Sequence, residues 1–261
     1  MQMVTEVNLN SDLGESFGLW RMGSDSEMLA IVRSANVACG FHASDPTVMA
    51  ETVRLAVKNG VSIGAHPGFP DLQGFGRRHM QFSNAEIEMM TAYQIGALIA
   101  VAAVNGGKVT HVKPHGMMSN MAAEDESMAA AITRATKAID RDLIFLAQAN
   151  TALSVAGRKV GLRVAEEVFA DRTYTDQGLL TPRREPNAMI KDAQASVEHV
   201  KRMIEAQAVF SLSGKRIPCQ VDSICVHGDE PTAVATAREV RRGLEASQIR
   251  IVALPEMQRL Q

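Results

Sequence analysis

Short apolar runs that end in polar or glycine-rich turns recur along this chain, and they constrain its fold more than any other feature. They lie at residues 36–42, 61–67, 109–116, 164–171 and 224–229. Helical patterns separate them, and the chain contains no Pro/Ser-rich linker or low-complexity segment. The alternation predicts a single α/β domain that spans residues 1–261.

Helix start signals support this alternation. Capping boxes are predicted at Ser24 with Glu27 and at Ser83 with Glu86, and Asp45 precedes a proline at a first helical position. The helix after Ser83 is expected to end at about residue 105, where a glycine pair follows. Further helices are expected at about 120–139, 151–158, 187–207 and 230–246, and a final strand at 249–254.

The strand within residues 7–15 is unusual because one of its faces is polar. At period two, that face holds Glu6, Asn8, Asn10 and Asp12, with Val7 and Leu9 opposite. A polar row is costly inside an ordinary core. This strand therefore either lines a polar cavity or turns one face to water.

Ionisable residues fall at the carboxyl end of each predicted strand. Parallel α/β sheets and barrels place their active sites at that edge. Taken singly, each histidine is more often structural than catalytic, but the recurrence at six strand ends favours a common site. Two long connections, 68–79 and 172–186, also follow strand ends, which is typical of lids and binding loops. Their arginines are candidate clamps for phosphate or carboxylate.

Composition excludes several classes of protein. The net charge of −2 gives no reason to expect nucleic-acid binding. The sequence shows no secretory signal pattern, and we expect no stretch to reach the roughly 18 apolar residues of a membrane span. The three cysteines have no C-x-x-C spacing, which argues against disulfides and structural zinc. We therefore expect a cytoplasmic enzyme.

Six motifs resemble the LamB/YcsF family. They are NLNSDLGE, NVACGFHASDP, SIGAHPGFPDLQGFGRR, KPHG, ADRTYTDQGLLTPR and VHGD, and the resemblance extends from about residue 7 to residue 255. It implies a distorted, seven-stranded (β/α) barrel of the glycoside hydrolase/deacetylase-like group. It also implies the reaction of an ATP-dependent 5-oxoprolinase, in which 5-oxo-L-proline is opened to L-glutamate while ATP is hydrolysed to ADP and phosphate. In that enzyme the family supplies the A component, which works with subunits B and C.

Opening a lactam requires carbonyl activation, a placed nucleophile and a proton for the departing nitrogen. The residues expected to supply catalytic groups are Asp12, Glu15, His42, His66, Lys113, His115, His227 and Asp229. Those expected to bind substrate are Asn8, Asn10, Arg77, Asp171, Arg172 and Arg183. ATP binding rests on the resemblance alone, because the sequence contains no phosphate-loop motif.

Two alternatives stay open at the level of sequence. Asp12, His42 and His66 could hold a divalent metal, which would suit a metal-dependent deacetylase of N-acetyl sugars. A divalent cation could instead enter only as Mg²⁺ with ATP. The chain could also be a barrel without activity that binds a partner or small ligand, although so many titratable groups at strand ends argue against this.

Overall fold

The chain folds around a closed barrel of parallel strands. The computed structural model describes residues 6–228 and 232–261. Within them, the barrel contains β1 (Glu6–Leu13), β2 (Ser34–Ala38), β3 (Ser62–His66), β4 (Val109–Val112), β5 (Ile144–Gln148), β6 (Arg163–Phe169) and β9 (Ser223–Cys225). Each strand pairs with the next in this order, and β9 pairs with both β6 and β1, which closes the ring. The predicted seven-stranded (β/α) barrel is confirmed.

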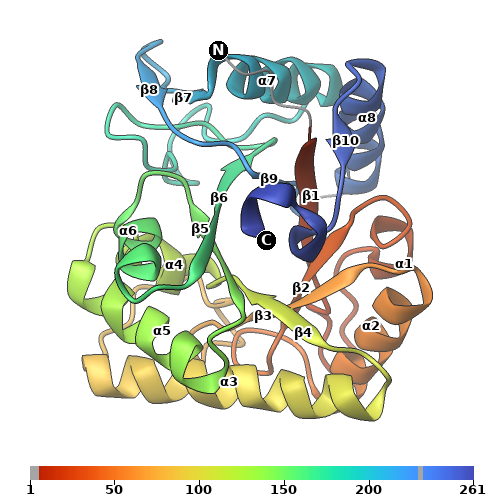
Figure 1. The fold of residues 1–261 in the computed structure, drawn as a ribbon, viewed down its shortest axis with the longest axis vertical. Coiled ribbons are helices and arrows are strands. Elements are labelled where there is room, and N and C mark those ends of the chain that lie inside the picture. Colours follow the sequence, from red (N-terminus) through yellow and green to blue (C-terminus); the bar gives the residue numbers. More distant parts are fainter. Residues whose placement is uncertain (1–5, 229–231) are drawn as a thin grey trace.

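Helices surround this barrel (Figure 1). They are α1 (Asp25–Met28), α2 (Pro46–Lys58), α3 (Asn84–Val104), α4 (Gly116–Ala122), α5 (Glu126–Ile139), α6 (Ala152–Lys159), α7 (Ala193–Ala206) and α8 (Ala233–Ala246). An antiparallel pair, β7 (Ala208–Phe210) and β8 (Arg216–Pro218), lies outside the ring, and the short β10 (Arg250–Ile251) pairs with the start of β1.

Two of the three predicted helix caps form. Ser83 and Glu86 make a complete capping box at α3, and the Asp45 carboxylate accepts hydrogen bonds from the backbone of Thr47 and Val48. The box at Ser24 is wrong, because within the described residues the Ser24 side chain makes no capping bond and α1 is only four residues long. The Glu27 amide, which would bond to the Ser24 hydroxyl in a capping box, instead donates to the Ser24 carbonyl at 3.1 Å.

Three predicted elements have different limits. The helix expected at 120–139 is two helices, because Asp125 leaves helical geometry and caps α5. The helix expected from residue 187 begins only at α7, where Asp192 caps it. The strand expected at 249–254 is reduced to β10 and is followed by 3₁₀ turns at Leu254–Glu256 and Gln258–Leu260.

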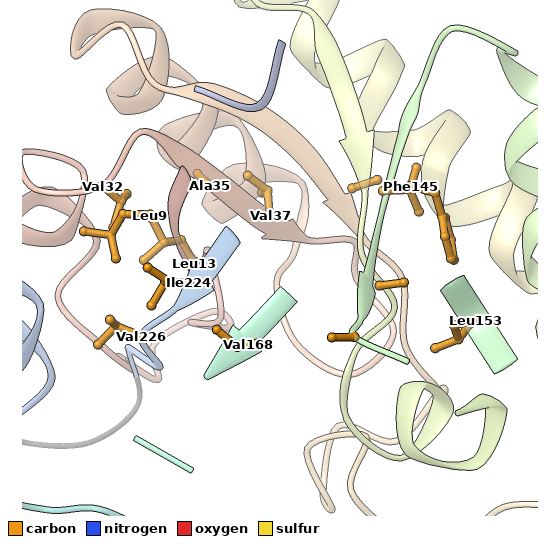
Figure 2. Packing of buried hydrophobic residues seen from close by; sticks show 14 of the residues in the cluster. Leu9, Leu13, Val32, Ala35, Val37, Phe145, Leu153, Val168, Ile224 and Val226 are labelled. Atoms are coloured by element: carbon orange, nitrogen blue, oxygen red, sulfur yellow. The ribbon is translucent and has the colours of Figure 1, made fainter. Parts of the chain in front are cut away.

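The hydrophobic core lies between the barrel and its helices, and the barrel interior is largely polar. Leu9 and Leu13 of β1 point outward and pack among Val37, Val168 and Ile224 (Figure 2). Asn8 and Asn10 alternate with them and point inward, where each bonds to side chains of other strands. At Asn8 and Asn10 the polar face of β1 therefore points into the barrel and not to water.

The C-terminal segment closes the amino-terminal end of the barrel. Leu254, Met257 and Leu260 are buried against Ile144 and Leu146, two inward residues of β5. In Figure 1 these last turns lie over the centre of the ring. This end is filled with apolar side chains, which leaves the opposite end, at the carboxyl ends of the strands, for a site.

Helix α3 departs from one expectation. By length and composition alone it is apolar enough to cross a membrane, whereas no such stretch was predicted. Its inner face, which includes Ile87, Ile95 and Leu98, is buried in the core. Core helices pass the same test of length and composition, so one helix of this kind is weak evidence for a membrane span.

Candidate active site

A cavity of about 470 Å³ opens at the carboxyl ends of the barrel strands. Its wall includes the predicted catalytic residues Asp12, Glu15, His66, Lys113, His115 and His227, together with Arg77, Arg172 and Arg183 from the predicted binding set. The two long loops expected to bind ligand both contribute to it. Residues that are 100 apart in the sequence meet here because every strand ends at the same edge.

Lys113, directly after β4, is the centre of the cavity floor. Its Nζ lies 2.9 Å from Asp12 Oδ1 and 3.0 Å from Glu167 Oε1, and it donates a 3.2 Å hydrogen bond to Cys225 Sγ. Burial alone would lower the pKa of Lys113, but the charge of Asp12 and its other neighbours raises that pKa well above the usual value. Lys113 is therefore a fixed ammonium ion.

Asp12 is held as a carboxylate in the same centre. Burial would raise its pKa, but His66 and Lys113 keep it well below the usual value. Asn36 donates a 2.8 Å hydrogen bond to Asp12 Oδ1. His66 Nε2 lies 3.3 Å from Asp12 Oδ2, while its Nδ1 donates to the Lys113 carbonyl at 2.6 Å. This backbone contact fixes the orientation of the imidazole.

Glu167 is a functional candidate that the sequence analysis missed. It is buried at the end of β6, accepts a 2.9 Å hydrogen bond from Asn10, and shares Lys113 with Asp12. Burial raises the pKa of its carboxyl, with Lys113 opposing this effect. The alternation of side chains along a strand could have identified it. Glu167 precedes the outward-facing Val168, so it must point into the barrel, as Asn10 does next to Leu9.

Asp171 and His227 form a second pair at the cavity. The two Asp171 oxygens lie 2.9 and 2.8 Å from His227 Nδ1. Burial would raise the Asp171 pKa, but His227 and Arg172 lower it, so Asp171 is a carboxylate. Asp171 is not among the residues that line the described cavity, and its role as a substrate ligand stays a prediction. Its place is behind His227, which it orients.

A third group, which we call the histidine cluster, consists of Glu15, His42, His66 and His115. The His42 and His115 rings stack with centroids 3.6 Å apart and planes 2° apart. Burial, followed by the neighbouring histidines, lowers both of their pKa values well below the usual range, so both rings are neutral. Gly76 has a φ of +61° above the stack, where a Cβ would lie 2.7 Å from His42 Cβ.

The predicted metal set is not assembled as expected. Among the described residues, the donor atoms of the histidine cluster lie within 4.8 Å of one another, whereas Asp12 groups with Cys225 and His227. His42 therefore joins Glu15 rather than Asp12. The fold brings the carboxylate at position 15 to the histidines because the chain turns at Gly14, with a φ of +69°, directly after β1.

Arginines form the rim of the cavity. Arg77 belongs to the first long loop, and its guanidinium lies 4.8 Å from the centre of the Phe75 ring. Arg183 and Arg184 come from the second loop. Arg172 is buried, and burial together with Arg183 lowers its pKa to about 10. Because Arg172 donates to the backbone carbonyls of Thr181 and Ala188, it also holds the second loop in place.

Two predicted substrate ligands lie beneath the cavity. Asn10 is fully buried, bonds to Glu167 and Ser223, and does not line the described cavity wall. Asn8 lies still deeper, where it bonds to Ser34 and to the Val252 carbonyl. Both amides make their hydrogen bonds within the barrel, and their contact with substrate stays a prediction. Asp229, also predicted to be catalytic, lies outside the described residues.

The barrel and the charged groups at its strand ends define an enzyme of the (β/α)-barrel class with an acid–base site. The chain belongs to the LamB/YcsF family, whose model matches residues 7–259. It is 53% identical over 252 residues to the A subunit of 5-oxoprolinase from Azoarcus sp. (strain BH72), and the match covers 97% of this chain and 98% of that protein.

Solved structures agree with this assignment. The lactam utilization protein of Thermus thermophilus has a TM-score of 0.90 and 42% identity, with 95% of this chain and all (100%) of that chain covered. T48 deacetylase has a TM-score of 0.51 and 14% identity, with 97% and 89% covered. The second likeness shows the fold alone and supports the deacetylase-like barrel.

Proposed function

We propose that this chain is the A component of an ATP-dependent 5-oxoprolinase and takes part in opening 5-oxo-L-proline to L-glutamate. The relationship to proteins of that name over nearly the full length supports the choice of substrate. The observation that carries the chemistry is the buried Asp12 carboxylate held between Lys113 and His66 at the cavity floor.

Each step of lactam opening has a candidate group in the cavity. The Lys113 ammonium stabilises the negative charge that develops on the lactam oxygen, and Asp12 and Glu167 hold this ammonium in place. His227, oriented by Asp171, accepts a proton from water and returns one to the departing nitrogen. Asp12 is too weakly basic for that task, because its pKa is lowered, so we assign it to orientation of the water and of Lys113.

ATP supplies the activation that an unstrained amide requires. In this proposal the lactam oxygen attacks the γ-phosphorus of ATP and ADP departs. Water then adds to the ring carbon, the C–N bond breaks as the nitrogen takes up a proton, and a second water hydrolyses the resulting acyl phosphate at carbon, so that phosphate leaves with the lactam oxygen. Arg77, Arg183 and Arg184 at the rim hold the phosphoryl group. A divalent cation accompanies the ATP phosphates. The sequence offers no phosphate loop for the rest of the nucleotide, so we assign that part of the binding to another chain of the complex.

The relatives are named as the A subunit of 5-oxoprolinase, which denotes one part of a multi-subunit enzyme. We propose that the other parts are subunits B and C and that the complex works in the cytoplasm. The decisive assay measures glutamate formation from 5-oxoproline and ATP with this chain alone and with both partners. Activity that needs all three supports the proposal, and a full complex without glutamate formation refutes it.

Isotopic labelling tests the activation step. If ATP phosphorylates the lactam oxygen, ¹⁸O placed in the 5-oxoproline carbonyl must appear in inorganic phosphate after turnover. Unlabelled phosphate, with all of the ¹⁸O retained in glutamate, would reject phosphorylation. The alternative of an N-acetyl sugar deacetylase has only the shared fold in its favour, and release of acetate from such sugars without ATP would be its signature.

A further inference from the structure

We propose that the histidine cluster is a binding site for one divalent transition-metal ion, such as Zn²⁺ or Co²⁺, next to the Lys113 centre, with which it shares His66. Its donors are three imidazoles and one carboxylate, which together form a ligand set that such ions prefer. Hard ions such as Mg²⁺ favour oxygen ligands, so the metal of this site is chemically distinct from the one that accompanies ATP.

The spacing of the donor atoms suits a small ion. A tetrahedral ion with bonds of about 2.0–2.1 Å holds its ligand atoms about 3.4 Å apart. Glu15 Oε1 lies 3.2 Å from His42 Nε2 and 3.7 Å from His115 Nε2. All four donor atoms fall within 4.8 Å of one another, close to the separation that a tetrahedral ion requires.

The buried Nε2 of His66 gives independent support. His66 is 1% exposed, and in the described part of the chain its Nε2 makes no well-aligned hydrogen bond, with the Asp12 carboxylate 3.3 Å away. Its Nδ1 donates to the Lys113 carbonyl, so Nε2 is the nitrogen left to face an ion. Metal-binding histidines typically have this arrangement, with one nitrogen fixed by a carbonyl and the other facing the ion.

A competing site can be set aside on charge. Asp12, Cys225 and His227 also bring donor atoms within 4.8 Å of one another. There, however, the Lys113 ammonium already contacts both Asp12 and Cys225, at 2.9 and 3.2 Å. A divalent ion would have to displace this buried cation. The donor atoms of the histidine cluster have no such lysine contact among the described residues.

The location gives the ion access to a ligand. Glu15, His66 and His115 all line the cavity, so an ion held by them can be reached from the substrate side. If the proposed lactam chemistry holds, such an ion would polarise the lactam carbonyl or a bound water. Metal binding itself does not depend on that chemistry, and it is tested without any turnover.

The test uses the full chain, freed of metal by a chelator and then titrated with Co²⁺ and Zn²⁺ against a chromophoric competitor. We expect one ion per chain and intense visible Co²⁺ bands typical of a four-coordinate site, without the near-ultraviolet band of a cobalt–thiolate bond. His42→Ala, His115→Ala and the isosteric Glu15→Gln should each weaken binding at least about 100-fold.

Matched controls separate the cluster from the rest of the cavity. His79→Ala removes an exposed histidine of the same cavity, and Cys225→Ser removes the only thiol of the competing group, so both should bind Co²⁺ as the unaltered chain does. Folding of each variant is checked by circular dichroism. Three results would each overturn the proposal: the folded, unaltered chain binds no ion, its Co²⁺ form shows a thiolate band, or the double variant H42A/H115A binds the ion as tightly as the unaltered chain.

Discussion

Replacing Lys113 with methionine should destabilise the protein strongly at neutral pH. Lys113 is nearly fully buried and is the cation shared by Asp12 and Glu167, at 2.9 and 3.0 Å. Methionine has a similar length but no charge, so both carboxylates would be left buried without a counter-ion. Breaking a buried pair in this way costs about 3–5 kcal/mol. At about 2–4 °C per kcal/mol for a chain of this size, the melting temperature should fall by roughly 6–20 °C.

The loss should depend on pH in a defined direction. In the unaltered protein the pKa of Asp12 lies below that of the unfolded chain, so Asp12 adds stability above about pH 4 that is lost as pH falls through its folded pKa. Without Lys113, the pKa values of Asp12 and Glu167 both rise above about 4, so the folded variant loses stability as pH increases. The difference between the two proteins should be largest near pH 7 and smallest near pH 4.

Urea denaturation of both proteins at several pH values measures this difference. Adding Glu167→Gln to the Lys113→Met variant removes one unpaired carboxylate and should restore roughly half of the loss. Lys108→Met, at an exposed lysine, is the control and should change the free energy of unfolding by less than about 0.5 kcal/mol. A Lys113→Met variant as stable as the unaltered protein at pH 7, or a loss that grows toward pH 4, would refute the reasoning.

Three further predictions address catalysis and helix capping. Asp12→Asn should keep the fold but lower glutamate formation by the assembled complex about 10²-fold or more, and near-normal turnover would contradict its assignment. Asp171→Asn should lower kcat more than it changes KM, by about 10²-fold, because His227 loses the carboxylate that orients it; an effect on KM alone would instead favour substrate binding. Asp45→Ala should cost about 1 kcal/mol in urea denaturation, whereas Ser24→Ala should cost less than about 0.5 kcal/mol, and equal losses would contradict the caps described above.

The sequence predicted the barrel and most of the cavity wall because both follow from local patterns. Alternation of strand and helix sets the fold class, and the side chain at a strand's carboxyl end must face the common edge. Lys113, His66 and His227 were found by this rule. This rule does not say how far along its strand, and therefore how far from the cavity, a polar residue lies. Asn8 and Asp12 share a face but lie about 13 Å apart at the rise of an extended strand, so only Asp12 reaches the cavity.

The sequence also could not show which of the site residues contact one another. Asp12 was paired with His42 because both follow early strands, yet the turn at Gly14 brings Glu15 to His42 instead. The missing capping box at Ser24 has a similar cause. The motif is present, but it does not determine whether the serine side chain bonds to the first turn of the helix. Such outcomes depend on tertiary contacts between strands that are distant in the chain.

The inward polar side chains act as a network rather than as separate ligands. Asn36 donates both to Asn10 and to Asp12, at 2.7 and 2.8 Å, and Asn10 in turn donates to Glu167. Glu167 and Asp12 then meet at Lys113. Because every member bonds to a residue on another strand, a shift of one strand would displace the ammonium at the cavity floor. The amides at positions 10 and 36 therefore help to hold Lys113 in position, although neither lines the described cavity.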